Sequence, residues 1–243
     1  MTMIFNSLNT SSLRKPMRTK FYAALLLISI FGLNGCKKDE VDTNAYTYIS
    51  VVNASPTVST YDVFLSGARI NSAALPSGGA VPYSQRLAGS YELKFSIAGR
   101  AESVLTKTVS LPQDAYQTFF LVGRTAPFDG FMTTEEVSAT STTHAYVRFV
   151  NVSPDAPALD LAIKGGAAVV TNRAFKTASA FTPVAAGTYI FDIKETSNGT
   201  VRTATESVTI GANLYYTVLV KGLLAPAAGG LELPLSAQVM VNR

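Results

Sequence analysis

The 243-residue chain is 47% apolar and 15% charged, against about 25% charged residues in an average soluble domain. Residues 1–35 contain four of the 20 basic residues and no acidic residue, and they account for the net charge of +4. The remaining residues contain 16 basic and 16 acidic side chains, so their net charge is zero. A neutral remainder excludes the basic surface of nucleic-acid-binding proteins. One Cys and one His exclude metal sites built from clusters of these residues. We therefore expect no metal, no cofactor and no nucleic-acid partner.

The first 36 residues have the pattern of a secretory signal. A basic stretch, 14–20, precedes Phe21–Leu33, which is thirteen residues without a charge. A helix that spans a bilayer needs about 20 apolar residues, whereas the core of a signal peptide has about 7–15. The segment Leu33-Asn34-Gly35-Cys36 then follows. It resembles the lipobox of bacterial lipoproteins, in which the chain is cut before the Cys and the thiol is acylated.

The lipobox implies that residues 1–35 are a signal peptide, removed by cleavage between Gly35 and Cys36. Cys36 would then carry lipid such as palmitate, and two or more acyl chains anchor a protein stably in a membrane. A single Cys cannot form an internal disulfide, so acylation also gives this residue a role. The alternative is a free Cys beside an uncleaved anchor.

Residues 36–44 are expected to be a flexible tether, because they lack apolar periodicity. Its segment 37–40, Lys-Lys-Asp-Glu, resembles the charged tether that directs some Gram-negative lipoproteins to the outer face of the outer membrane. The alternative is an ordinary solvated linker. We expect a lipid-anchored protein of the cell envelope, in the outer membrane, with display at the cell surface as the further expectation.

An internal repeat covers the rest of the chain. Tyr48–Pro56 matches Tyr146–Pro154 at an offset of 98, and Tyr116 matches Tyr215 at an offset of 99. One residue is therefore inserted in the second copy, and the turn-forming pair Asn198-Gly199 is the expected place. Each unit has the size of a β-sandwich, about 100 residues. We expect two such domains, over residues 45–140 and 141–243.

Apolar and polar residues alternate along four segments of each unit, and the apolar positions agree between the copies. A period of two indicates strands with one buried face. Clusters of Gly, Pro, Asn and Ser separate these segments at short intervals, which is typical of sandwiches. We predict an all-β fold of two tandem Ig-like or Greek-key β-sandwiches. The predicted inward pairs are Ile49/Val147, Val51/Phe149, Tyr61/Leu159, Val63/Leu161, Leu65/Ile163, Tyr91/Tyr189, Leu93/Phe191, Phe95/Ile193, Phe119/Val218 and Leu121/Val220.

Both units resemble a bacterial family known as domain of unknown function 4397, whose members commonly open with R-F-x-N-x-S-P-D-A-P. The second unit fits this opening over Arg148–Pro157. The first unit departs from it, with Ser50 in place of the Arg and Thr57–Ser59 in place of Asp-Ala-Pro. The resemblance implies an extracytoplasmic, often lipid-anchored protein and implies no activity.

The Asn-x-Ser-Pro motif is the most distinctive candidate site. One interpretation is a ligand-binding loop, and the other is a turn in which the Asn amide binds loop backbone and the Pro restricts φ. Strand alternation places both Asn side chains on the inward side, which favours the structural interpretation. The residues are Asn53, Ser55 and Pro56 in the first unit, and Asn151, Ser153 and Pro154 in the second.

Asp155 and Asp160 allow a paired-carboxylate hypothesis, as in glycoside hydrolysis. The first unit has no counterpart of Asp155, and turn and edge roles are the favoured interpretation of both residues. A Ser-His-Asp triad would need the sole histidine, His144, which lies in the Ser/Thr-rich junction between the units. We expect no catalytic residue.

The leading hypothesis is a non-enzymatic envelope lipoprotein, anchored to the membrane by its N-terminal lipid, whose sandwiches serve binding, adhesion or assembly. The expected ligand is a glycan or an envelope protein. One alternative is a hydrolase or accessory subunit of a surface polysaccharide-processing system, and another is a structural spacer. Phe64, Phe128 and Phe131 are expected to be exposed. One interpretation is that they mark a partner surface, and the other is that they are scattered surface apolar residues without a function.

Overall fold

The computed structural model describes residues 45–124 and 128–242. The signal peptide, the Gly35–Cys36 cleavage site and the tether predicted above lie outside these residues. Every regular element of the described residues is a β-strand, as predicted. Within the same residues no helix is long and apolar enough to cross a membrane.

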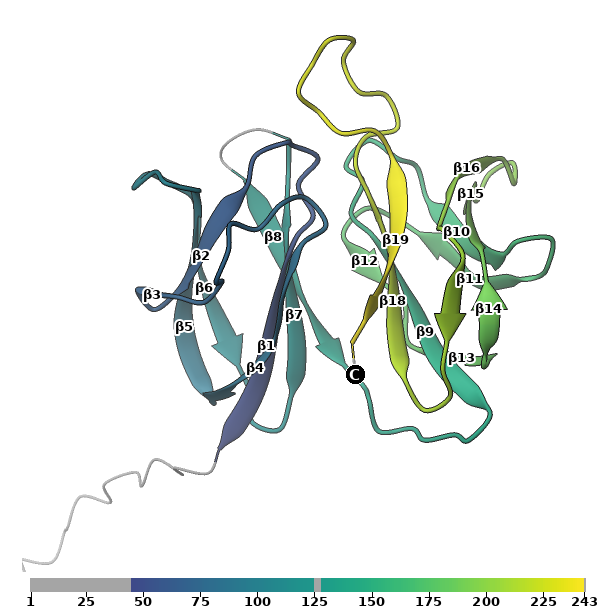
Figure 1. The fold of residues 1–243 in the computed structure, drawn as a ribbon, viewed down its shortest axis with the longest axis horizontal. Helices are drawn as coiled ribbons and strands as arrows, with labels where there is room; N and C mark the ends of the chain where they lie inside the picture. The colour runs from purple at the N-terminus through teal and green to yellow at the C-terminus, as the bar shows by residue number, and fades with distance from the viewer. Residues whose placement is uncertain (1–44, 125–127, 243) are drawn as a thin grey trace, which may run out of the picture. The chain divides into compact units, whose positions relative to one another are not determined.

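The first sandwich consists of two four-stranded sheets, with strand orders β4-β1-β7-β8 and β3-β2-β5-β6 (Figure 1). Strands β1 and β7 pair in parallel, and the other neighbours pair antiparallel. The strands are β1 (Tyr46–Asn53), β2 (Tyr61–Leu65), β3 (Ala68–Arg69), β4 (Ala80–Leu87), β5 (Gly89–Ile97), β6 (Ser103–Leu111), β7 (Tyr116–Val122) and β8 (Asp129–Glu135).

The second sandwich repeats this plan with more interruptions. One sheet has the order β12-β9-β18-β19, with β13 also paired to β9; the other has the order β11-β10-β15-β16, and β14 and β17 form a separate pair. Its strands are β9 (His144–Asn151), β10 (Leu159–Ile163), β11 (Ala168–Arg173), β12 (Thr177–Ala178), β13 (Thr182–Ala185), β14 (Gly187–Tyr189), β15 (Phe191–Glu195), β16 (Val201–Ala204), β17 (Val208–Ile210), β18 (Tyr215–Lys221) and β19 (Ser236–Val241).

The registers of the two sandwiches agree at residues that the repeat aligns. Ser50 lies opposite Thr118 across the parallel pair β1–β7, and Arg148 lies opposite Thr217 across β9–β18. The expectation that the Asn198-Gly199 turn absorbs the inserted residue was wrong. Ile193 pairs with Thr203 as Phe95 pairs with Leu105, so the offset of 98 continues through β16, whereas Tyr189 pairs with Val208 as Tyr91 pairs with Val109, which requires an offset of 99 in β17. The extra residue therefore lies between β16 and β17, where the second sandwich has a break between these strands.

Each sandwich has its own apolar core, and the cores contain the predicted inward residues. In the first, Ile49, Val51, Phe119 and Leu121 of one sheet pack against the facing sheet. Val147, Phe149, Val218 and Val220 form the equivalent half of the second core. Two-residue alternation therefore predicted the correct core face of both sandwiches.

A third apolar cluster lies between the sandwiches. It is formed by alternate residues on the outer faces of β1, β7, β9 and β18, so these central strands are buried on both faces. Residues from Thr43 onward accordingly form one compact unit. The buried members are Val52, Ala54, Phe120, Val122, Val150, Val152 and Leu219, with Phe131, Phe175, Ala178 and Met240 packed against them.

Two of the aromatic residues expected on the surface contribute to packing instead. Phe131 stacks on Phe120 in the cluster between the sandwiches, with ring centroids 5.2 Å apart. Phe128 packs edge-on against Tyr61 in the first core. The expectation that both rings are exposed was wrong: Phe131 of β8 lies against the cluster between the sandwiches, and Phe128 lies against the first core.

Candidate functional site

The Asn-x-Ser-Pro motifs close turns at the ends of β1 and β9. The Asn53 amide donates to the Leu75 carbonyl, and its Oδ1 accepts from the N–H of Ser55 at 3.1 Å and from the Ser55 hydroxyl at 2.7 Å. Asn151 repeats the geometry, donating to the Arg173 carbonyl and accepting from the Ser153 N–H. Both amides are fully buried, so their hydrogen-bonding groups serve the turn.

The Asp155 carboxylate binds backbone of a later loop. Its two oxygens accept from the N–H groups of Leu224 and Ala225 at 2.8 and 3.0 Å. Burial raises the pKa of Asp155, but the hydrogen bonds from Ala225 and Leu224 outweigh burial and hold the pKa below its ordinary value. A carboxyl group with a lowered pKa is poorly suited to act as a general acid.

Asp160 is engaged separately. Its Oδ1 accepts from the Asn172 N–H of β11 at 2.8 Å and from the Thr196 hydroxyl of the β15–β16 turn at 2.6 Å, both in its own sheet. The structure thus places the two carboxylates on different partners. His144 is exposed at the start of β9, beside the hydroxyl of Thr143.

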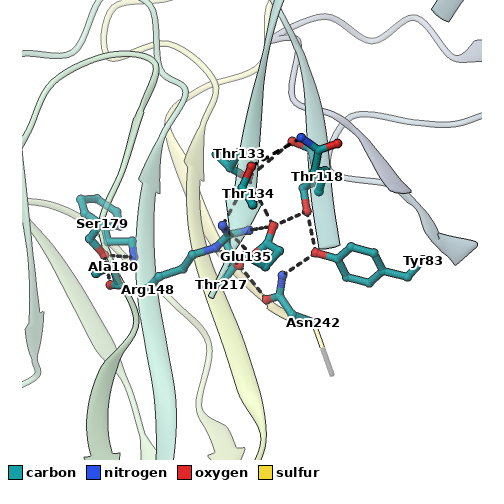
Figure 2. Close-up of polar contacts among 12 residues, drawn as sticks. Tyr83, Thr118, Thr133, Thr134, Glu135, Arg148, Ser179, Ala180, Thr217 and Asn242 are labelled. Carbon is teal, nitrogen blue, oxygen red and sulfur yellow. Dashed lines mark hydrogen bonds and ion pairs between the residues drawn. The ribbon is translucent and has the colours of Figure 1, made fainter. Parts of the chain in front are cut away.

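The residue that sequence reasoning missed is Arg148. It points away from the core of its own sandwich, as alternation predicted, yet its side chain is only 2% exposed because the first sandwich covers it. Its Nη2 donates to Glu135 Oε1 at 2.8 Å, and its Nη1 lies 2.7 Å from Glu135 Oε2 in an ion pair without an aligned hydrogen bond. Figure 2 shows this pair joining β9 of one sandwich to β8 of the other.

The ion pair belongs to a closed ring of six side chains, three from each sandwich (Figure 2). The hydroxyl of Thr118 donates to Glu135, so it can only accept from the hydroxyl of Tyr83. Tyr83 in turn accepts from the Asn242 amide. The donors therefore point in one direction from the guanidinium to the carboxylate, an order in which each bond polarises the next. The steps are Arg148 to Thr217 at 2.8 Å, Thr217 to Asn242 at 2.7 Å, Asn242 to Tyr83 at 3.3 Å, Tyr83 to Thr118 at 2.7 Å and Thr118 to Glu135 at 2.7 Å.

The position of Tyr83 in the ring shifts the pKa of its phenol. Burial, followed by the nearby charge of Glu135, raises the pKa of the Tyr83 phenol to about 12. The phenol therefore remains a neutral donor at any physiological pH.

Four of the six ring residues occupy equivalent positions of the two repeats, and the other two, Arg148 and Tyr83, do not correspond to each other. Thr118 and Thr217 occupy matching sites, and Glu135 and Asn242 lie beside the matching residues Tyr116 and Tyr215. The Thr118–Glu135 and Thr217–Asn242 hydrogen bonds are therefore one interaction repeated, at 2.7 Å in both sandwiches. The two units meet through the same face, in the manner of a two-fold dimer.

Two clefts flank the ring, and they are also equivalent. We name them the Tyr83 cleft, of about 380 Å³, and the Phe181 cleft, of about 430 Å³. Each lies between an edge strand of one sandwich and the last strand of the other, and Arg148 lines both. Matching lining residues are Ala80 and Ala178, Pro82 and Ala180, Tyr83 and Phe181, and Met240 and Thr133.

Further contacts hold the sandwiches together around the clefts. The Gln238 amide donates to the Gly78 carbonyl at 2.8 Å, and the Lys176 ammonium forms an ion pair with Asp129. The hydrogen bond from Lys176 holds the pKa of Asp129 below its ordinary value. No group of three or more His, Cys, Asp or Glu residues that could bind a metal occurs within residues 45–124 and 128–242.

Comparison with solved structures finds low overall similarity. A family 41 α-glucan-binding module from streptococcal virulence factors is 9% identical, with a TM-score of 0.24, and the match covers 72% of this chain and 93% of the module. A family 26 carbohydrate-binding module from an amylase of Eubacterium rectale is 10% identical, with a TM-score of 0.25 and coverages of 80% and 95%. A leucine-rich repeat protein from Bacteroides thetaiotaomicron is 13% identical, with a TM-score of 0.18 and coverages of 78% and 27%.

Comparison by sequence gives one family. No curated protein matches the chain. The family model described as "Domain of unknown function (DUF4397)" matches residues 47–162, which include nearly all of the first sandwich, all of β9 and most of β10.

Proposed function

We propose that the protein is a lipid-anchored protein of the cell envelope that acts by binding and without catalysis. The basic stretch, the short uncharged segment and the lipobox ending at Cys36 support the anchor and export. We place it in the outer membrane, and the charged segment after Cys36 supports display at the cell surface.

The observation that carries the binding proposal is the interface between the sandwiches. An apolar cluster and a buried ion pair hold the two units in one orientation. That orientation creates two clefts whose walls come from both units. Ligand sites commonly occur in clefts between domains, with a few polar groups placed by a rigid scaffold.

The carboxylates argue against the hydrolase alternative. Asp155 and Asp160 accept hydrogen bonds from backbone N–H groups of different segments, the loop after β18 and strand β11. The bonds to Asp155 hold its pKa below the ordinary value, whereas a glycosidase needs one carboxyl group with a raised pKa.

Protease shaving of intact cells tests the location, with Cys36→Ala as the control. The wild-type protein should be lost from the cells on shaving and the variant should not reach the surface. Protection of the wild-type protein would contradict surface display. Screening the lipidated protein against envelope glycans and envelope proteins then tests binding, since the spacer alternative predicts no specific ligand.

A further inference from the structure

The two clefts differ in the hydrogen bonds that join their walls, as a comparison of equivalent residues shows. In the Tyr83 cleft, the hydrogen bond from Asn242 to Tyr83 connects the two walls, and the bond from Gln238 to Gly78 holds the last strand against the other sandwich. In the other cleft the residue equivalent to Tyr83 is Phe181, which has no hydroxyl group. The residue equivalent to Asn242 is Glu135, which pairs with Arg148. The Asn242–Tyr83 bond of the first cleft therefore has no counterpart in the second, where the contacts across the sandwiches are the Lys176–Asp129 ion pair and the hydrogen bond from Arg148 to Thr133 at 3.2 Å.

The walls of the Phe181 cleft are strand edges and not sheet faces. Residues on one face of a strand alternate, whereas consecutive residues line a groove that runs along its edge. One wall of this cleft is formed by Phe131–Thr134 and Glu136, and the other by Ala178–Phe181. The groove therefore follows β8 over five residue steps, or about 17 Å at about 3.3 Å per residue.

Strand β8 offers backbone groups to a partner. It is the last strand in the order β4-β1-β7-β8, so β7 pairs with one of its edges and no strand of the described residues pairs with the other. Such an edge presents a row of N–H and C=O groups to any extended chain that lies beside it.

The aromatic side chains of the cleft are already engaged. Phe131 stacks on Phe120, and the ring of Phe181 is covered by the Arg148 guanidinium at 5.1 Å and contacted by Tyr215 at 4.9 Å. A sugar ring needs an open aromatic face on which to stack. The outer edge of β8 pairs with no strand of the described residues, which favours a polypeptide over a glycan.

We propose that the Phe181 cleft binds an extended polypeptide segment of a partner protein, which adds to β8 as a fifth strand of the sheet β4-β1-β7-β8. This proposal rests on the proposed binding function and names its ligand class. Main-chain hydrogen bonds to β8 supply affinity, and contacts with Lys176 and Glu136 select the sequence.

Matched substitutions separate the two clefts. Ala180 and Pro82 occupy equivalent exposed positions, so Ala180→Trp fills the Phe181 cleft and Pro82→Trp fills the other. The probe is a library of random linear heptapeptides displayed on phage, selected on the full-length lipidated protein in detergent micelles. Thermal melting of both variants checks that they remain folded.

Peptides enriched on the wild-type protein should lose at least tenfold in affinity for Ala180→Trp and retain affinity for Pro82→Trp. Bound peptide should also slow amide hydrogen exchange in β8, since strand addition engages its backbone. Failure to enrich peptides, equal binding to both variants or unchanged exchange in β8 would overturn the proposal.

A glycan array run with the same variants distinguishes this proposal from the broader one. A glycan whose binding is lost in Ala180→Trp would overturn the polypeptide class and leave a binding function in place. If neither peptides nor glycans bind the wild-type protein, both the cleft proposal and the binding function fail.

Discussion

Arg148 of β9 and Glu135 of β8 connect the two sandwiches through an ion pair in which both side chains are at most 2% exposed. Breaking a buried pair by removing one partner leaves an uncompensated charge, which typically costs about 3–5 kcal/mol. Glu135→Ala should therefore lower the free energy of unfolding by this amount in urea denaturation. Glu136→Ala, which removes an exposed neighbouring carboxylate, should change it by less than about 0.5 kcal/mol.

The double variant Arg148→Met, Glu135→Leu provides a second test of the same pair. Apolar residues of similar size often replace a buried pair without loss, because the desolvation penalty disappears. The double variant should be more stable than Glu135→Ala. A double variant less stable than that single variant would show that the pair adds stability beyond charge compensation.

Tyr83 should give the protein a specific sensitivity to alkaline pH. Its folded-state pKa of about 12 lies above the value of 10.0 for a free phenol, so the folded state holds this proton more tightly. The stability that it contributes is present below pH 10 and is lost as the pH rises from 10 towards 12. A shift of this size is worth up to about 3 kcal/mol.

The Tyr83→Phe variant is the control for this dependence. Removing the hydroxyl eliminates the titration and also two hydrogen bonds, at about 1 kcal/mol each near neutral pH. The difference in melting temperature between the wild-type protein and the variant should be smaller at pH 11 than at pH 8. Parallel melting curves across this range would contradict the buried position of the phenol.

Asp155 should stabilise the loop that follows β18. Because its pKa is lowered in the folded state, its contribution is present at neutral pH and is lost as the pH falls through its lowered pKa. Asp155→Asn should cost about 1 kcal/mol at neutral pH, since the amide retains one acceptor and loses the charge. The stability difference between the wild-type protein and Asp155→Asn, measured by thermal melting, should decrease as the pH is lowered. A difference that does not depend on pH would contradict this role of Asp155.

Gly222 is required by a close approach of the backbone in the same loop. It has φ +85°, and a Cβ atom there would lie 2.1 Å from the Pro234 carbonyl oxygen. Gly222→Ala should cost about 2–4 kcal/mol, from the backbone conformation and from the overlap together. Gly229 has φ +73° and no atom within 4 Å of such a Cβ, so Gly229→Ala should cost only about 1 kcal/mol in the same denaturation experiment.

Much of the fold could be predicted from the sequence because strand alternation is local. Positions such as Val51 and Phe149 are apolar in both copies, and each lies in the core of its own sandwich. Agreement between the copies separated these positions from chance apolar residues. It did not locate the insertion, because the extra residue lies between β16 and β17, where no turn motif marks it, and not at Asn198-Gly199.

The interface could not be predicted by the same rule. Alternation placed Arg148 on the outer face of its sheet, and such a face is normally exposed to solvent. A signal was present, since Val52 and Val150 are outward positions that are apolar in both copies. A strand that is apolar at successive positions is typically buried on both faces. The pairing of Arg148 with Glu135 has no local signature, because it depends on how two sheets pack.

Differential scanning calorimetry of the lipidated full-length protein tests most directly whether the two sandwiches form one unit. The account predicts a single transition whose calorimetric and van 't Hoff enthalpies agree, and a broader or split transition for Glu135→Ala. Two separate transitions in the wild-type protein, unchanged by Glu135→Ala, would show that the sandwiches unfold independently and would contradict the interface on which the proposed binding clefts depend.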